Sequence, residues 1–309
     1  MISLSKFDPI ESDTLIGLGG HFSFIKELIS KGKLPKVVLL TGKKGIGKFT
    51  LTSHLMHYYF DKLNYDEKKS NFKKNNSFCI QFRENLFPNI FHLEGTNFKT
   101  VKIDLIRKLK SDLQKTSLNK GKRFIILDDV EIFNINSLNG LLKIIEEPSS
   151  NDHFILINNK SQKLLETVKS RCLEIKIILD EITRKKTLSV LLNKFKQDDI
   201  LNFNTNSSSP GNYLKFNYLF NEMNLNKDDS LYNNFKKILS YYKKDKNILY
   251  KDFLLFLVDF YIQKDSFKKN QNLQLLIDKR SLIMKNINNF FVHNLSSNTF
   301  LNSLEGKTE

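Results

Sequence analysis

The chain has few cysteines and no long apolar run, and each of these absences excludes a class of protein. Only two of its 309 residues are cysteine, Cys79 and Cys172, and no CxxC pair is present. This argues against a disulfide framework or a zinc module and fits a reducing compartment. The longest apolar run, at 253–258, is far shorter than the roughly 20 residues that a membrane-spanning helix needs. Because the N-terminal residues carry acids and no hydrophobic segment, we expect a cytoplasmic protein without a targeting sequence.

Positive charge is abundant. Lys and Arg outnumber Asp and Glu by 49 to 33, which gives a formal net charge of +16. Such an excess favours a polyanionic partner, so a DNA-binding module is one alternative; its affinity for duplex DNA would fall steeply with salt. The excess is mostly lysine, and Asn, Phe and Ile are also frequent. A strongly AT-biased genome gives any protein this composition, so codon bias is an alternative explanation of the charge.

The segment 36–50, KVVLLTGKKGIGKFT, predicts a phosphate-binding loop between a buried strand and a helix. Gly42, Gly45, Gly47 and Lys48 follow the strand at the spacing of a Walker A loop. Backbone N–H groups of such a loop, the positive end of the next helix and the lysine can together hold a polyphosphate.

One residue breaks this pattern. Position 49 is Phe, where a working loop has Ser or Thr, whose hydroxyl holds the magnesium ion. Thr50 follows, but it is turned by about 100° from that position along a helix. The loop therefore predicts a degenerate nucleotide site.

Strands and helices alternate through the first 178 residues, which predicts an α/β fold with a parallel, doubly wound sheet whose ligands bind at the carboxyl ends of the strands. The predicted strands are 37–40, 88–93, 124–127, 154–157 and 173–177, and the predicted helices are 21–31, 48–63, 101–118, 137–147 and 163–169. Residues 61–77 are charged and rich in asparagine, so we expect a mobile surface loop. His54 and His57 have no third ligand in view, and we interpret them as surface histidines.

After residue 178 the strand signals stop. Helices are predicted at 181–196, 232–242, 251–262 and 273–292, with a polar stretch at 202–211. We expect the tail from Ser296 onward to be frayed.

The strand at 124–127 ends in Asp128 and Asp129, which has the form of a Walker B motif. Asp128 would hold magnesium. The second acid of working ATPases is usually Glu, and Asp129 is one methylene shorter, so it would position the attacking water less well.

Three blocks carry a family resemblance: ILDDVE at 126–131, SLNGLLKIIEEP at 137–148 and SRC at 170–172. They resemble the bacterial clamp-loader subunits of the AAA+ class, whose members read close to NALLKTLEEP followed by SRC. The resemblance covers residues 14–215 and implies an AAA+ α/β domain at 1–178, a helical lid at 179–218 and an all-α collar domain at 219–309, which would join other loader subunits in a ring.

Four departures favour the stator of the loader over its ATP-hydrolysing subunit. Phe49 and Asp129 are two of them. Asn212 follows Ser-Pro-Gly at the place of the sensor arginine in motor relatives, and the zinc-binding cysteines of the family are reduced to Cys79. The resemblance therefore implies that no ATP hydrolysis, no zinc and no other cofactor are required, with ATP binding weak or absent.

Arg171 in the SRC block resembles the arginine finger that this family presents to the γ-phosphate on a neighbouring subunit, a task that suits a planar, permanently charged group. Its alternative is a surface arginine at a helix end. Asn158 and Asn159 stand where AAA+ relatives keep a polar sensor, although two turn-forming asparagines explain them equally well.

The resemblance implies a structural role in the DNA polymerase III clamp loader. The partners would be the gamma/tau and delta subunits, and through them the sliding clamp and primer-template DNA, with no membrane. An ATP-hydrolysing subunit of the gamma/tau type, using Lys48, Asp128 and Thr50 with a displaced metal, remains the alternative.

Overall fold

The computed structural model describes residues 2–95, 101, 103–114, 121–202, 208–266 and 272–304. Parts of three predicted segments lie outside these residues: 102 and 115–118 of one helix, 203–207 of the polar stretch and 305–309 of the tail. The chain divides into two compact units: one holds residues 5–190 and 209–211, and the other holds the described residues of 2–4, 191–208 and 212–309. The three-part division at residues 178 and 218 stays a prediction.

Five parallel strands form the sheet of the first unit, in the order β4-β5-β6-β1-β7. The strands are β1 Val37–Thr41, β4 Ile90–Glu94, β5 Arg123–Asp128, β6 Asp152–Asn158 and β7 Leu173–Lys176. Strands β1, β5 and β6 are buried along almost their whole length because apolar runs of this kind need cover on both faces. The predicted parallel α/β sheet is confirmed, and each predicted strand boundary lies within two residues of the observed one.

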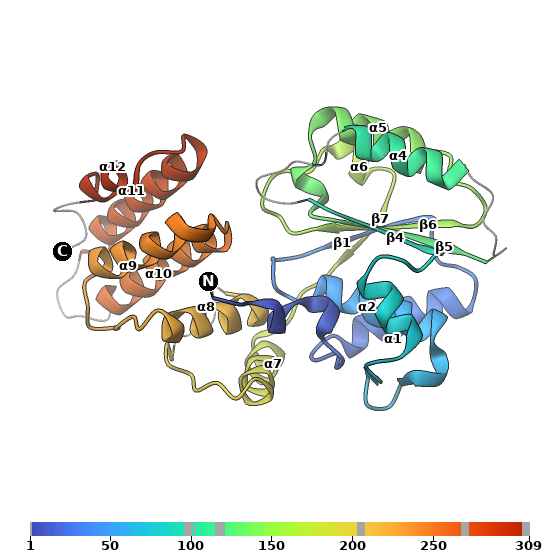
Figure 1. Cartoon of the computed structure of the whole chain (residues 1–309), viewed down its shortest axis with the longest axis horizontal. Coiled ribbons are helices and arrows are strands. Elements are labelled where there is room, and N and C mark those ends of the chain that lie inside the picture. Colours follow the sequence, from blue (N-terminus) through green and yellow to red (C-terminus); the bar gives the residue numbers. More distant parts are fainter. Residues whose placement is uncertain are drawn as a thin grey trace. The chain divides into compact units, whose positions relative to one another are not determined.

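Helices cover both faces of this sheet, with α1 and α2 on one face and α4, α5 and α6 on the other (Figure 1). Their bounds are α1 Gly19–Ser30, α2 Lys48–Phe60, α4 Ile103–Gln114, α5 Ile135–Ile145 and α6 Glu166–Lys169. Successive strand residues serve opposite cores: Val38 and Leu40 belong to the core under α1 and α2, and Val37 and Leu39 to the other. Helix α6 is shorter than the predicted 163–169.

The second unit is built of helices, as predicted. Further helices of the described chain are α3 Ser77–Arg83 in the first unit and α7 Glu181–Lys194, α8 Pro210–Glu222, α9 Leu231–Asp245, α10 Leu249–Ser266, α11 Leu273–Val292 and α12 Ser297–Asn302. The boundary between the units falls within α7 and α8. The prediction of a frayed tail from Ser296 is wrong for residues 296–304, because Ser296 caps α12 and Phe300, Leu301 and Leu304 are buried.

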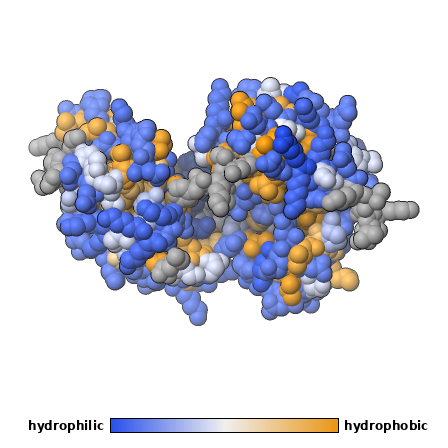
Figure 2. Space-filling view, turned by 45° about the horizontal axis from the view of Figure 1, so that its top comes forward, coloured by the Kyte–Doolittle hydropathy of each residue, from blue (hydrophilic) through white to orange (hydrophobic). Residues whose placement is uncertain are grey.

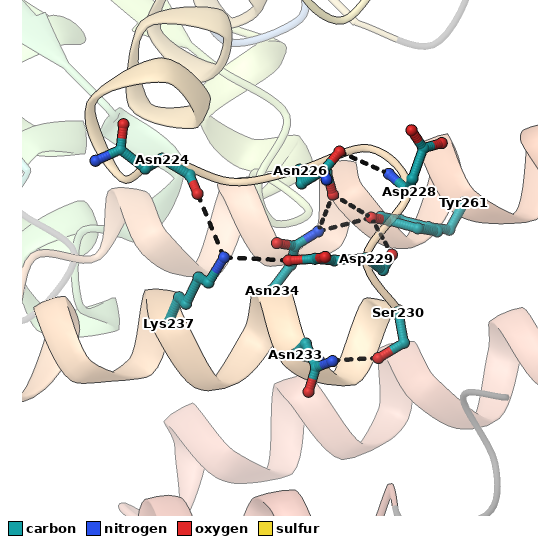
Figure 3. A network of polar contacts seen from close by, with 9 residues as sticks. All are labelled: Asn224, Asn226, Asp228, Asp229, Ser230, Asn233, Asn234, Lys237 and Tyr261. Carbon is teal, nitrogen blue, oxygen red and sulfur yellow. Dashed lines mark hydrogen bonds and ion pairs between the residues drawn. The ribbon is translucent and has the colours of Figure 1, made fainter.

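A buried amide holds the turn between α8 and α9 (Figure 3). The Nδ2 of Asn234 donates to the carbonyl of Asn226 at 2.8 Å and to the Tyr261 hydroxyl at 2.6 Å, and this hydroxyl donates to the carbonyl of Asp229 at 2.9 Å. Lys237 binds the Asp229 carboxylate at 3.1 Å. The turn is thereby joined to both α9 and α10, since Tyr261 belongs to α10.

Hydrophilic residues cover most of the surface seen in Figure 2, and the hydrophobic patches are small and separate. Among the described helices, none combines the length and the apolar character that crossing a membrane requires.

Two predictions about α2 and the region after it are wrong. Residues 61–77 contain a short helix, η3 Lys62–Asn64, and a hairpin of β2 Tyr65–Asp66 with β3 Asn71–Phe72. His54 and His57 are buried rather than on the surface. The reason is aromatic packing: the His57 ring stacks on Phe72 with 3.6 Å between centroids, and Phe78 packs on it edge-on.

We expect two shielded imidazoles, the buried His57 and the partly buried His92, to make the fold sensitive to acid. Burial lowers the pKa of His57 from 6.5 to about 3 and the pKa of His92 to about 4. The unfolded chain therefore binds more protons than the folded chain below about pH 6.5. The contribution of these histidines to the free energy of unfolding is expected to be fully present above that pH. It should fall by roughly 1.4 kcal/mol per pH unit for each histidine as the pH drops toward 4.

Urea denaturation followed by circular dichroism between pH 7 and pH 4.5 measures this slope. His57→Phe keeps a ring among the aromatic neighbours but removes the proton-binding group, so its slope should be shallower. His293→Phe, at an exposed histidine, is the matched substitution. Equal slopes for the two variants would contradict the prediction.

Candidate functional site

The glycine-rich loop joins the carboxyl end of β1 to the first residue of α2. Gly47 precedes the helix with a φ of 101°, a backbone conformation that glycine adopts without strain. The loop thus has the strand-loop-helix arrangement of an anion-binding turn, with Gly42, Gly45, Gly47 and Lys48 in one segment.

Lys48 is buried, and its ammonium group is bound to the loop itself. The Nζ donates to the carbonyl of Gly42 at 2.8 Å and to that of Lys43 at 2.9 Å. Burial lowers the pKa of Lys48 to about 8, although Asp128 and Glu131 act in the opposite direction. The ammonium group is therefore already bound by two carbonyl groups of the loop. A polyphosphate would have to replace these carbonyls as its hydrogen-bond partners.

Phe49 points into the protein core. Its side chain is 9% exposed, and its ring lies 4.8 Å from the ring of His92 on β4. Thr50 is only partly buried on the next position of α2. The residue that should give magnesium an oxygen ligand is thus an apolar core residue.

The residues at the start of α8 are hydrogen-bonded to the glycine-rich loop. The amide of Gly211 donates to the carbonyl of Gly45 at 3.0 Å, and the Ser209 hydroxyl donates to the carbonyl of Lys44. A Cβ at position 211 would lie 2.7 Å from the Gly45 oxygen, so only glycine permits this approach. The sequence predicted no contact between these segments; Asn212, expected at the sensor position, is the next residue of α8.

The acidic pair lies at the same edge of the sheet. Asp128 ends β5, and Asp129 follows in the left-handed conformation with a φ of 53°. The Nδ2 of Asn159 donates to Asp129 at 2.6 Å and to Asp128 at 3.2 Å. Asn158 lies beside Thr41 in the sheet and caps its own turn through Lys160 N–H. Of the two asparagines, Asn159 is therefore the one that contacts the acids.

Both carboxyl groups are hard to ionise. Burial, followed by the neighbouring carboxylate of Asp129, raises the pKa of Asp128 to about 7. Burial also raises the pKa of Asp129, although the hydrogen bond from Asn159 opposes it. A proton thus competes with a divalent cation for Asp128 near neutral pH.

Sequence reasoning missed the role of Glu131. This buried carboxylate accepts from the amide of Asn159 at 3.0 Å and from the amide and hydroxyl of Ser161 at 3.1 Å and 2.7 Å. It fixes the turn after β6 and with it the Asn159 side chain. The only sequence signal was an acid three residues after Asp128.

Arg171 lies just after α6 and is about one third exposed. Its Nε and Nη2 bind the Glu146 carboxylate at 2.8 Å and 2.7 Å, and its Nη1 donates to the carbonyl of Thr167 at 2.8 Å. Its hydrogen bonds within the described chain therefore do not involve the loop or the acidic pair.

The residues present do not fit a hydrolytic magnesium-ATP site. The backbone cradle remains, but Phe49 offers no oxygen, Lys48 is bound to the loop and Asn159 is bound to the acids. Cys79, the remaining cysteine of the expected zinc region, is a free and buried thiol on α3, Ser77–Arg83.

Comparison with known proteins gives relatives that are subunits of DNA polymerase III, among them delta', gamma and tau subunits. The subunit delta' of DNA polymerase III from Pseudomonas aeruginosa is 33% identical over 97 residues, which is 31% of this chain and 30% of that protein. The subunit delta' from Buchnera aphidicola subsp. Schizaphis graminum is 29% identical over 230 residues, 73% of this chain and 66% of that protein. These matches span less than two thirds of the relatives' own lengths.

The fold also has a solved counterpart. A DNA polymerase III gamma subunit-related protein from Thermotoga maritima matches with a TM-score of 0.55 and 15% identity, over 93% of this chain and 98% of that one. At this identity the likeness shows the fold alone.

A family model described as DNA polymerase III, delta subunit, matches residues 20–180, more than half of the chain. The matched region contains the loop, the acidic pair and Arg171, and it confirms the resemblance to clamp-loader subunits that the three sequence blocks indicated. The chain therefore belongs to the DNA polymerase III delta-subunit family.

Proposed function

We propose that this chain is the delta-prime stator subunit of a DNA polymerase III clamp loader and that it hydrolyses no ATP itself. One observation carries the proposal: Phe49 is packed in the core where a magnesium ligand is needed, while Arg171 keeps an accessible guanidinium. Relatives named subunit delta' support the assignment.

In this role the subunit supplies Arg171 to an ATP site on a neighbouring subunit. A guanidinium binds phosphate oxygens through two parallel N–H groups and stabilises the charge that develops during phosphoryl transfer. The ring partners would be the gamma/tau and delta subunits, acting in the cytoplasm on the sliding clamp and primer-template DNA. The helical second unit would join the collar of that ring.

The loop has a different task in this proposal. Its carbonyl groups hold the start of α8 through Ser209 and Gly211, and its lysine is bound internally. The loop would thus have a structural task in the first unit, and ATP would bind weakly or not at all. The gamma-type alternative requires instead that magnesium bind without an oxygen at position 49.

We expect the isolated chain to show no magnesium-dependent ATP turnover, with or without primed DNA, because no side chain completes the metal site. A coupled phosphate-release assay measures this against Lys48→Ala, whose folding is checked by circular dichroism. Turnover that disappears in Lys48→Ala would establish the gamma-type alternative.

The same preparation tests the stator role. A loader reconstituted from gamma/tau and delta subunits should load clamps on primed DNA only when this chain is added. Loading at the full rate in its absence would contradict the proposed function.

A further inference from the structure

The guanidinium of Arg171 is held on one side by a carboxylate from another helix. Nε and Nη2 both approach Oε1 of Glu146, at 2.8 Å and 2.7 Å. On the other side Nη1 donates to the Thr167 carbonyl at 2.8 Å and lies 3.4 Å from the Ser170 hydroxyl. Of the five N–H donors of an arginine, the Nε–Nη2 edge is thereby bound to protein, and Nη2 keeps a second N–H directed away from Glu146.

Glu146 itself is well anchored. It is the C-cap residue of α5, with helical backbone angles and an amide that donates to the Leu142 carbonyl at 3.0 Å. The helix begins at an Asn134 cap, and Leu141 and Ile145 are buried on its inner face. The negative end of the helix dipole lies at the same place and favours a nearby cation.

We propose that Glu146 is a positioning residue for Arg171. It binds Nε and one N–H of Nη2, so that the guanidinium is held in one orientation and its remaining N–H groups are available to the polyphosphate of a neighbouring subunit. The inference rests on the proposed function, because it assumes that Arg171 acts across a subunit boundary.

Stability alone gives little reason for this ion pair. The side chains of Arg171 and Glu146 are 36% and 45% exposed, and exposed pairs of this kind contribute little to folding. The ion pair can contribute more to phosphate binding than to folding, because a flexible arginine must lose its rotamer freedom when it binds the phosphate. A pair that holds the side chain beforehand removes part of that loss.

The test uses the complete loader, reconstituted with variants of this chain. Glu146→Ala should lower the kcat of DNA-stimulated ATP turnover about three- to tenfold, with KM for ATP nearly unchanged, since one side chain is released from its held conformation. Glu146→Gln keeps an acceptor oxygen and should recover most of the rate. The matched control is Glu147→Ala, which removes the adjacent, exposed glutamate.

A double variant separates positioning from other roles. Glu146→Ala should have no further effect in an Arg171→Ala background if it acts through the arginine. An additive loss, an unchanged rate or a faster rate in Glu146→Ala would overturn the inference. If Arg171→Ala itself leaves turnover unchanged, the proposed function fails instead.

Discussion

Replacing Arg171 with alanine is expected to slow ATP hydrolysis by roughly a thousandfold at the one ATP site that this chain would serve in the assembled loader. The positive charge of the guanidinium stabilises the negative charge that develops in the transition state, and Arg171 is the basic residue of the SRC segment. Because the side chain is partly exposed and its hydrogen bonds within the described residues are to Glu146, Thr167 and Ser170, folding and assembly should persist.

Single-turnover hydrolysis by the reconstituted complex resolves this one site from the others. Arg171→Lys keeps the charge but not the planar pair of donors, so it should recover only part of the rate. The matched control is Arg83→Ala, which removes an arginine of similar exposure that pairs with Glu11 at 2.7 Å. An assembled Arg171→Ala loader with the wild-type rate would rule out the finger assignment.

Replacing Asp152 with alanine should have the largest effect on stability. Asp152 and Arg123 stand at the starts of β6 and β5, and their side chains are 5% and 8% exposed. The guanidinium binds both carboxylate oxygens, at 2.6 Å and 3.0 Å, and also the carbonyl of Leu113. Removing the carboxylate leaves a buried, permanently charged group without its counter-ion, which is expected to cost about 3–5 kcal/mol in the free energy of unfolding.

Urea denaturation at pH 7 measures this loss. Arg123→Met combined with Asp152→Leu should recover much of it, because no charge is then left unpaired. Glu27→Ala, which breaks an exposed ion pair with Lys31, should leave the free energy of unfolding almost unchanged, because solvent screens such a pair. A loss as small as that of Glu27→Ala would show that the buried pair does not hold the two strands.

The sheet could be predicted because its signals are local. Apolar runs and their spacing identified β1, β5 and β6, whose neighbours along the chain are the helices that cover them. The region after α2 was misread for the opposite reason: Tyr65 and Phe72 stand among charged residues, and their burial depends on His54 and His57 of another element. Local polarity predicted exposure, while packing decided otherwise.

The candidate site divides in the same way. Phe49 lacks an oxygen wherever its ring points, and Arg171 carries its charge in any fold. The sequence by itself therefore determined that position 49 offers no metal ligand and that position 171 can bind a phosphate. Only the tertiary structure decided that the Phe49 ring packs on His92 and that Asn159, rather than Asn158, contacts the acidic pair.

Side-chain contacts between different elements could not be predicted from the sequence. Ser209 binds Lys44 over 165 positions, and Glu146 holds Arg171 over 25. Such pairs leave no periodic signal, because each depends on the close approach of two separately folded segments and on a few ångströms of space, such as the missing Cβ of Gly211. Residue type sets which chemistry is available, and packing sets which groups meet.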